Sequence, residues 1–269
     1  MAVLDPAVLP HAATVLRTNL DQLLGRALGG GWSPEELVEL VRRQSGGQHV
    51  GALVAVIERS SGATGVSASQ QRALSEQVGL PRPPDLQTQD GIACALWLIA
   101  LLAILPTSEA MRPAPGPTPE RESRPEDRKL ATVRALLAKA ESTVHDDEAE
   151  ALTTKAQELI SRYALDRLLE EESGHQRGPA DVALRRIWLD APYVSAKATL
   201  VAAVAMANRC RAVAVDRLGF SAVLGDPHDL EVVELLATSL LVQATRRCSA
   251  TGARPGTDAR PPGRSGTRS

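Results

Sequence analysis

Aromatic residues are scarce in this chain of 269 residues, which has three tryptophans, two tyrosines and one phenylalanine. A core must therefore be built from Leu, Val, Ile and Ala, which favours closely packed helices. Long apolar runs are also lacking. The longest, Ile92 to Leu105, has 14 residues, whereas a membrane-spanning helix needs about 20. We therefore expect a buried helix there and no membrane partner, with an interfacial or membrane segment as the minor alternative.

Cysteine is scarce as well. Cys94, Cys210 and Cys248 lie far apart in the sequence and form no C-x-x-C pair, so neither a disulfide framework nor a cysteine zinc site is indicated. The first residues have neither the basic region nor the apolar region of a secretory signal peptide. We therefore expect a cytoplasmic protein with reduced thiols.

Positive charge is concentrated at one end of the chain. The formal net charge is −2, but residues 246–269 hold six arginines and one aspartate, so this tail carries +5 and the rest of the chain −7. An acidic body is poorly suited to binding a phosphate backbone. The tail consists largely of glycine, proline, arginine and threonine, a composition that predicts a disordered basic tail.

The first part of the chain, residues 1–105, is predicted to be a helical region. Its apolar residues recur at the spacing of one helix face. They include Leu16, Leu20, Leu23, Leu24 and Ala27. Ser33 and Glu36 form a capping-box pattern around Pro34, which predicts a helix from Pro34 to about Gln44. A further helix is expected over residues 50–57, a loop over 60–69 and a short helix over 70–78.

A linker and a domain boundary are predicted over residues 106–127. This segment has six prolines and almost nothing apolar to bury, so ordering it would cost conformational entropy without compensation. Residues 128–166 follow with two apolar stripes separated by a polar break at 142–147, in which Thr143 and Asp146 are capping candidates. Two stripes joined by so short a connection predict an αα-hairpin.

Residues 182–245 are predicted to form a small α+β domain. Strands are expected at residues 184–189, 211–215 and 220–224, the last two joined as a hairpin. An alanine-rich helix should run from Pro192 to a left-handed cap at Asn208. A final helix should begin with Asp226 as its cap and Pro227 as its first residue. The predicted fold is thus mainly α, with a small α+β layer in the order strand, helix, β-hairpin, helix.

The segment of residues 129–166 contains the stretches LLAKAES (136–142), EAEA (148–151) and KAQELISRY (155–163). On these stretches it resembles the bacterial and phage domain-of-unknown-function family numbered 2786. Residues 197–246 look like the companion C-terminal domain that often follows in actinobacterial-type members. The resemblance implies a fold arrangement and no established reaction, so the catalytic residues stay unknown. In such relatives a helix is expected to continue past Thr245, and the tail that replaces it here resembles a truncated or frame-shifted end.

Sites for metals and cofactors are not indicated. Tyr193 and Lys197 match a Y-x-x-x-K spacing, but no G-x-G-x-x-G motif accompanies them, so we interpret them as surface residues. The ligand-type clusters around His145 and His228 lie at expected helix starts, where acids are common for capping reasons alone. We therefore predict no metal site and no cofactor.

Nucleic-acid binding through arginine side chains is one alternative for the function of this chain. The candidates are Arg209, Arg211 and Arg217 on the predicted β-hairpin, together with Arg185 and Arg186. The preferred hypothesis is a non-enzymatic protein-interaction module, because a two-helix hairpin cannot bury enough surface alone and must dock against its own chain or a protein partner. A hydrolase of unrecognised type is the third hypothesis.

Overall fold

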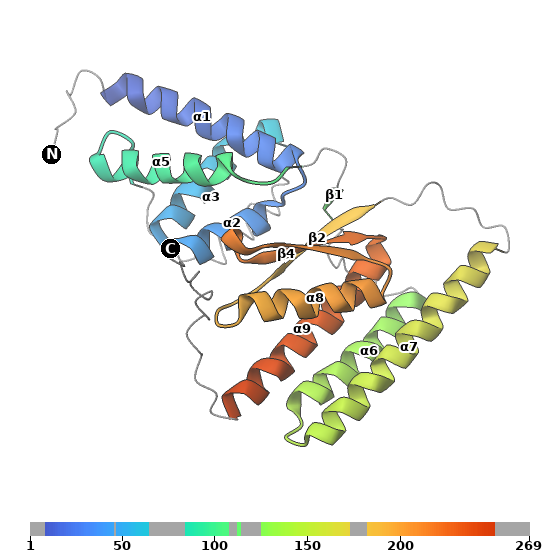
Figure 1. The fold of residues 1–269 in the computed structure, drawn as a ribbon. Coiled ribbons are helices and arrows are strands. Elements are labelled where there is room, and N and C mark those ends of the chain that lie inside the picture. The colour runs from blue at the N-terminus through green and yellow to red at the C-terminus, as the bar shows by residue number, and fades with distance from the viewer. Residues whose placement is uncertain are drawn as a thin grey trace, which may run out of the picture. The chain divides into compact units, whose positions relative to one another are not determined.

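A computed structural model describes residues 9–45, 47–64, 84–107, 112–113, 125–172 and 182–250. The chain divides into two compact units, Met1–Pro113 and Ala114–Ser269 (Figure 1). The division falls inside the predicted linker of residues 106–127, of which only 106–107, the two-residue strand β1 (Arg112–Pro113) and 125–127 are described.

The first unit is helical, as predicted. Its helices are α1 (Leu9–Gly29), α2 (Pro34–Gln44), α3 (Gly47–Thr64) and α5 (Gln89–Ala103). The predicted capping box is confirmed at the start of α2, where the backbone N–H of Glu36 donates to Ser33 Oγ at 3.1 Å and the backbone N–H of Ser33 donates to Glu36 Oε2 at 2.9 Å. The long apolar run is confirmed as the buried helix α5, because Leu98 and Leu102 lie in the core.

The predicted loop over residues 60–69 is wrong at its start, because α3 continues to Thr64. Asp21 of α1 explains part of the extension. Its carboxylate accepts hydrogen bonds from Arg59 Nη2 at 2.7 Å and from Ser60 Oγ at 3.0 Å, which holds this part of α3 against α1. The rest of the predicted loop and the predicted short helix over residues 70–78 lie outside the described residues.

The second unit begins with the predicted αα-hairpin. Helix α6 (Pro125–Ser142) and helix α7 (Asp146–Glu172) pack against each other through their two apolar stripes. The buried members of these stripes are Leu130, Val133, Leu137, Ala140, Ala149, Ala156 and Ile160. The predicted end of the hairpin at residue 166 is too early, because α7 continues to Glu172. Residues 167–172 are Arg, Leu and Glu, which are good helix formers and so continue the helix readily.

The predicted α+β layer is also confirmed. Strands β2 (Ala183–Trp188), β4 (Phe220–Gly225) and β3 (Arg211–Val215) form an antiparallel sheet in the order β2, β4, β3. In this register Ile187 lies opposite Ser221 of β4, and Val213 lies opposite Ala222. Helices α8 (Val194–Ala207) and α9 (Pro227–Ala250) pack on one face of the sheet (Figure 1).

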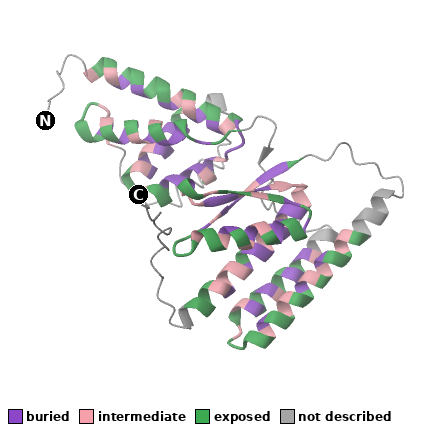
Figure 2. Cartoon of the chain, viewed as in Figure 1, coloured by how far each residue is buried: buried purple, intermediate pink, exposed green. Residues whose placement is uncertain are grey.

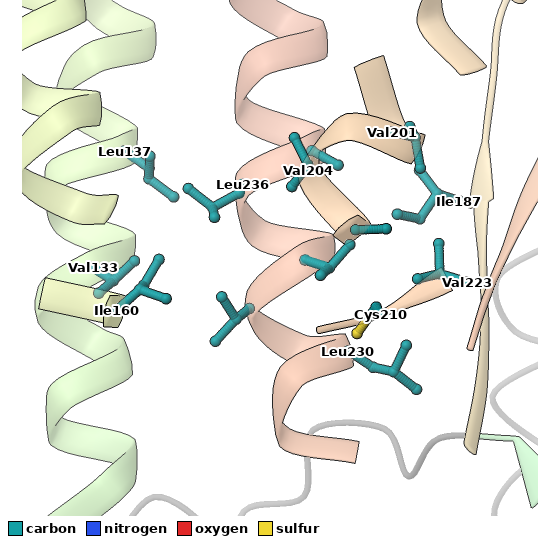
Figure 3. Packing of buried hydrophobic residues seen from close by; sticks show 14 of the residues in the cluster. Val133, Leu137, Ile160, Ile187, Val201, Val204, Cys210, Val223, Leu230 and Leu236 are labelled. Atoms are coloured by element: carbon teal, nitrogen blue, oxygen red, sulfur yellow. The ribbon is translucent and has the colours of Figure 1, made fainter. Parts of the chain in front are cut away.

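The hairpin and the α+β layer share one hydrophobic core. Helix α9 contacts β2 and β4 on one side and α6 on the other. Figure 3 shows Val133, Leu137 and Ile160 of the hairpin pointing toward Leu236 of α9, while Ile187 and Val223 point from the sheet toward α8 and α9. The hairpin thus buries its apolar stripes within its own chain, while the outer surfaces of these helices remain exposed (Figure 2).

Two details at the ends of α8 differ from the prediction. The helix begins at Val194 instead of Pro192. The left-handed residue after it is Arg209, with φ 60°, whereas Asn208 has φ −116°. The backbone N–H of Cys210 donates to Ala205 O at 2.8 Å, which is the long hydrogen bond of a Schellman cap with Arg209 in the position that usually holds glycine.

The end of α9 also lies beyond its predicted position. Residues 246–250 were predicted to belong to the disordered tail, but they are helical, because α9 ends at Ala250. Arg247 explains this in part, since its Nε donates to Oδ1 of Asp146 at 3.0 Å and so ties the last turns of α9 to the start of α7. Residues 251–269 lie outside the described residues.

Candidate binding groove

A groove of about 770 Å³ lies between α7, α8 and α9 in the second unit. Its floor and one wall are apolar. They consist of Ala203, Val204 and Ala207 of α8 and Leu236 and Leu240 of α9. The alanines arise because α8 is an almost uniformly apolar helix rich in small residues, so it leaves an apolar flank facing outward after its core side is packed.

The opposite wall of the groove is formed by α7 and contains a row of uncharged polar side chains. Thr153, Gln157 and Ser161 recur at intervals of four residues, with Thr154 beside them. Residues spaced in this way lie on one helix face. The other face of α7 carries the apolar stripe that packs on α6. The side of α7 toward the groove therefore carries a row of uncharged polar residues, beside which Glu150, Glu158 and Arg162 also line the groove.

Two buried amides complete the floor. Asn208 is 8% exposed and Gln243 is 9% exposed. Asn208 Nδ2 donates to Val204 O at 2.8 Å, and Gln243 Nε2 donates to Thr153 Oγ1 at 3.2 Å and to Ser239 Oγ at 3.3 Å. Within the described residues neither amide oxygen accepts a hydrogen bond. Both oxygens can therefore serve a donor that enters the groove.

Charged residues also line the groove, most of them on the same helix α7. Glu150 and Arg247 lie toward the start of α7, and Glu158 and Arg162 lie further along it. Glu158 is 3.1 Å from Lys155 Nζ, and Arg247 is engaged with Asp146. The groove can thus bind an apolar surface and present neutral hydrogen-bonding groups beside it. Its described lining contains no nucleophile held against a general base.

The structure separates the predicted nucleic-acid-binding arginines. Arg209 donates to Asp229 from Nε at 3.1 Å and from Nη2 at 2.7 Å, and this hydrogen bonding raises the pKa of Arg209. Arg211 begins β3, whereas Arg217 lies in the turn after its other end. A five-residue strand spans at least about 13 Å. Arg209 and Arg211 are therefore neighbours, Arg217 is distant from them, and the nucleic-acid role of all three stays a prediction.

The other two arginines of the nucleic-acid hypothesis, Arg185 and Arg186, make contacts within the fold. Arg185 pairs with Glu234 of α9. Arg186 is only 6% exposed, and its guanidinium lies 6.0 Å from the centre of the Phe220 ring. These two side chains lie on opposite faces of β2, as neighbouring strand residues do. They do not extend a basic patch across the hairpin.

The remaining motifs are capping and surface features. Lys197 Nζ donates to Asp190 O at 2.7 Å, and Tyr193 is the left-handed residue that precedes α8. The backbone N–H of His228 donates to Asp226 Oδ1 at 2.9 Å, which confirms Asp226 as the cap of α9. Among the described residues no group of three or more His, Cys, Asp or Glu side chains is placed to hold a metal ion.

Sequence reasoning did not find the groove. The only signal was the absence of charge at Thr153, Thr154, Gln157 and Ser161 within a helix whose other exposed positions are largely charged. That signal shows a polar face but not what lies opposite it. The position of α8, which supplies the apolar wall, depends on long-range packing that no local pattern encodes.

The second unit is an αα-hairpin packed on one helix of a small α+β layer. Residues 128–167, which contain most of α6 and α7, match the model of a family described as "Protein of unknown function (DUF2786)". The resemblance of the hairpin to this family is thereby confirmed, while the proposed companion domain stays an expectation. No curated protein and no solved structure matches the chain. No helix in the described part of the chain is long and apolar enough to cross a membrane.

Proposed function

We propose that this chain is a cytoplasmic, non-enzymatic protein-interaction module whose binding site is the groove between α7, α8 and α9. The occupant that fits is an amphipathic helix of a partner protein. The observation that carries the proposal is the pairing of an apolar surface of α8 and α9 with an α7 wall that contains a row of uncharged polar residues. A partner helix with an apolar stripe bordered by hydrogen-bonding side chains matches both surfaces.

The dimensions of the groove agree with a helical occupant. Its α7 wall extends from Glu150 to Arg162, which corresponds to about 18 Å at a rise of 1.5 Å per residue. This length accommodates about three turns of helix. Ala203 and Ala207 have short side chains, so a second helix can approach α8 closely, toward the lower end of the roughly 8 to 10 Å range of helix separations.

The test is a selection of helix-forming peptides against the full-length chain, using a displayed library of about 15 residues per peptide. We expect recovered peptides to share apolar residues at positions i, i+3 or i+4 and i+7. Binding of each recovered peptide is then measured to two variants. Ala203→Arg places a long charged side chain in the groove, whereas Ala196→Arg places the same side chain at an exposed α8 position outside it.

The expected result is that Ala203→Arg weakens peptide binding at least about tenfold, equivalent to about 1.4 kcal/mol, while Ala196→Arg leaves it unchanged. Circular dichroism and thermal unfolding should show that both variants are folded. Peptides that lack an apolar stripe, or that bind both variants equally well, would contradict the proposal.

A further inference from the structure

One end of the groove, at the start of α7, carries a carboxylate without an ion-pair partner. Glu150 lines the groove there, and it takes part in no ion pair among the described residues. Helical spacing places it on the same face of α7 as Thr154, Gln157 and Ser161, which also line the groove. The side chain of Glu150 therefore lies on the groove side of α7 and not on its outer surface.

Gln243 of α9 supplies a second acceptor at the same end of the groove. Its Nε2 donates to Thr153 Oγ1 at 3.2 Å, and Thr153 lies one turn after Glu150 on α7. The residue is only 9% exposed. In the part of the chain that the structure describes, Gln243 Oε1 accepts no hydrogen bond and is not sealed from solvent. A largely buried amide thus presents a vacant acceptor in the groove lining, close to a carboxylate.

Two acceptors side by side suit a cation. A carboxylate and an amide oxygen both accept hydrogen bonds, whereas a lysine ammonium offers three N–H donors and an arginine guanidinium five. Arg247 also lines this end of the groove, but its Nε donates to Asp146 Oδ1 at 3.0 Å and its Nη2 donates to Asp146 O at 3.3 Å. Arg247 therefore neutralises the aspartate one turn before Glu150, and Glu150 is left for a cation of the occupant.

The other end of the groove has the opposite charge. Arg162 lines it about three turns further along α7 and forms no ion pair with any described residue. Glu158, which also lines the groove, lies 3.1 Å from Lys155 Nζ. The α7 wall thus changes from negative to positive along its length. A helix is stabilised by acids in its first turn and by bases in its last turn, so such a helix complements this wall when it runs antiparallel to α7.

We propose that the occupant of the groove is a helix with a lysine or arginine in its last turn, and that this cation binds between the carboxylate of Glu150 and Gln243 Oε1. The helix runs antiparallel to α7, with an acidic first turn near Arg162. Glu150 and Gln243 are then the residues that select a basic partner segment. The inference rests on the proposed function, since it requires a helix in the groove, and it adds the charge and the direction of that helix.

The test extends the peptide selection against the full-length chain. Recovered peptides should be enriched in Lys or Arg in their last turn and in Asp or Glu in their first turn. Replacing that base by Gln in the tightest peptide should weaken binding about tenfold. Glu150→Gln should have an effect of similar size and add little to it, because both changes remove the same contact. Glu158→Gln, on the same wall, is the matched control and should change the affinity less than about twofold.

A charge reversal and a spin label test the pairing and the direction. Glu150→Lys should weaken binding of the basic peptide at least about tenfold, and a peptide with Glu in place of its base should regain most of that loss. Gln243→Met removes the amide oxygen and should weaken the basic peptide more than its Gln variant. A nitroxide at the C-terminus of the peptide should broaden the backbone amide NMR signal of Glu150 more strongly than that of Arg162.

The outcomes separate this inference from the proposed function. Peptides that lose affinity for Ala203→Arg but bind Glu150→Gln as well as the original chain would overturn the inference and leave the proposed function standing. A nitroxide that broadens Arg162 more strongly would overturn the direction. Failure to recover any peptide, or peptides insensitive to Ala203→Arg, would contradict the proposed function and this inference with it. Should Gln243→Met not fold, the variants of Glu150, an exposed residue, decide.

Discussion

The guanidinium of Arg209 donates to both carboxylate oxygens of Asp229, at 3.1 Å and 2.7 Å, and so joins the end of α8 to the first turn of α9. The side chain of Asp229 is only 8% exposed. Arg209 adopts φ 60°, a conformation that favours glycine. The contact between these two residues therefore compensates for an unfavourable backbone conformation.

Two substitutions of Arg209 distinguish the contribution of its ion pair to stability from the cost of its left-handed backbone conformation. Arg209→Ala leaves the carboxylate of Asp229 largely buried without its partner, and we expect a loss of about 2 kcal/mol in the free energy of unfolding. Arg209→Gly loses the same pair but relieves the left-handed backbone, so it should be about 1 kcal/mol more stable than Arg209→Ala. Urea unfolding followed by circular dichroism measures both. Equal stability of the two variants would show that the backbone at residue 209 is not strained.

Cys210 should make stability depend on alkaline pH. Burial raises the pKa of the Cys210 thiol from its ordinary 9.0 to about 11, and the nearby carboxylate of Asp229 adds to this effect while Arg209 opposes it. Because the folded state holds the proton more tightly, the contribution is fully present below pH 9 and is lost as the pH rises through about 11. The expected loss is of the order of 2 kcal/mol.

Two cysteine variants check this dependence. In Cys210→Ala the decline in the free energy of unfolding between pH 9 and pH 11 should become shallower, whereas in Cys248→Ala, which removes an exposed thiol, it should match the original chain. Reaction with a thiol reagent at pH 8 should modify Cys248 in the folded chain and leave Cys210 unmodified until denaturant is added. Rapid modification of Cys210 in the folded state would contradict its burial.

Glu148 should lose part of its acidity when Thr143 is changed. The hydroxyl of Thr143 donates to Glu148 Oε2 at 2.6 Å, and Lys139 Nζ lies 3.1 Å from Oε1. The Thr143 hydrogen bond and then Lys139 lower the pKa of Glu148 from its ordinary 4.5. Thr143→Val should therefore raise the pKa of Glu148, as measured by NMR titration of its carboxyl carbon, while Thr154→Val should not.

The effect of Thr143→Val on the free energy of unfolding should also depend on pH. A lowered pKa in the folded state stabilises the fold above pH 4.5, and this contribution disappears as the pH falls through the lowered value. Thr143→Val should therefore destabilise the hairpin at pH 7 and have a smaller effect in acid. The backbone N–H of His145 also donates to Thr143 Oγ1, at 3.3 Å. If Thr143→Val destabilised the hairpin equally at both pH values, the loss of this hydrogen bond, and not the pKa of Glu148, would explain the effect.

Two buried serines should respond in opposite ways. Ser221 and Ser239 are both 1% exposed. Within the described residues the hydroxyl of Ser221 has no hydrogen-bond partner, whereas that of Ser239 accepts from Gln243. Ser221→Ala should leave the free energy of unfolding unchanged or raise it by up to about 1 kcal/mol, and Ser239→Ala should lower it by about 1 kcal/mol. Guanidinium unfolding of the two variants compares them directly, and a destabilising Ser221→Ala would reveal a partner for that hydroxyl.

Local patterns predicted most of the elements because their signals are local. The capping box at Ser33 satisfies amides within one turn of helix, and the alternation of residues in β3 repeats over a few residues. The predictions were wrong where contacts between residues far apart in the sequence determine the local structure. Arg247 binds Asp146 and holds α9 helical beyond the predicted end, and Asp229 holds Arg209 in a conformation that composition would assign to Asn208.

The sequence by itself determined the αα-hairpin, its likeness to a family of proteins of unknown function and the order of the α+β layer, because helix and strand periodicity and capping act between residues close in the chain. Only the tertiary structure decided that α7, α8 and α9 enclose a groove and that β3 is the last strand in the order of the sheet. Both features depend on which elements become neighbours, and that choice is made by burial of the shared core around α9, a property of residues far apart in the sequence.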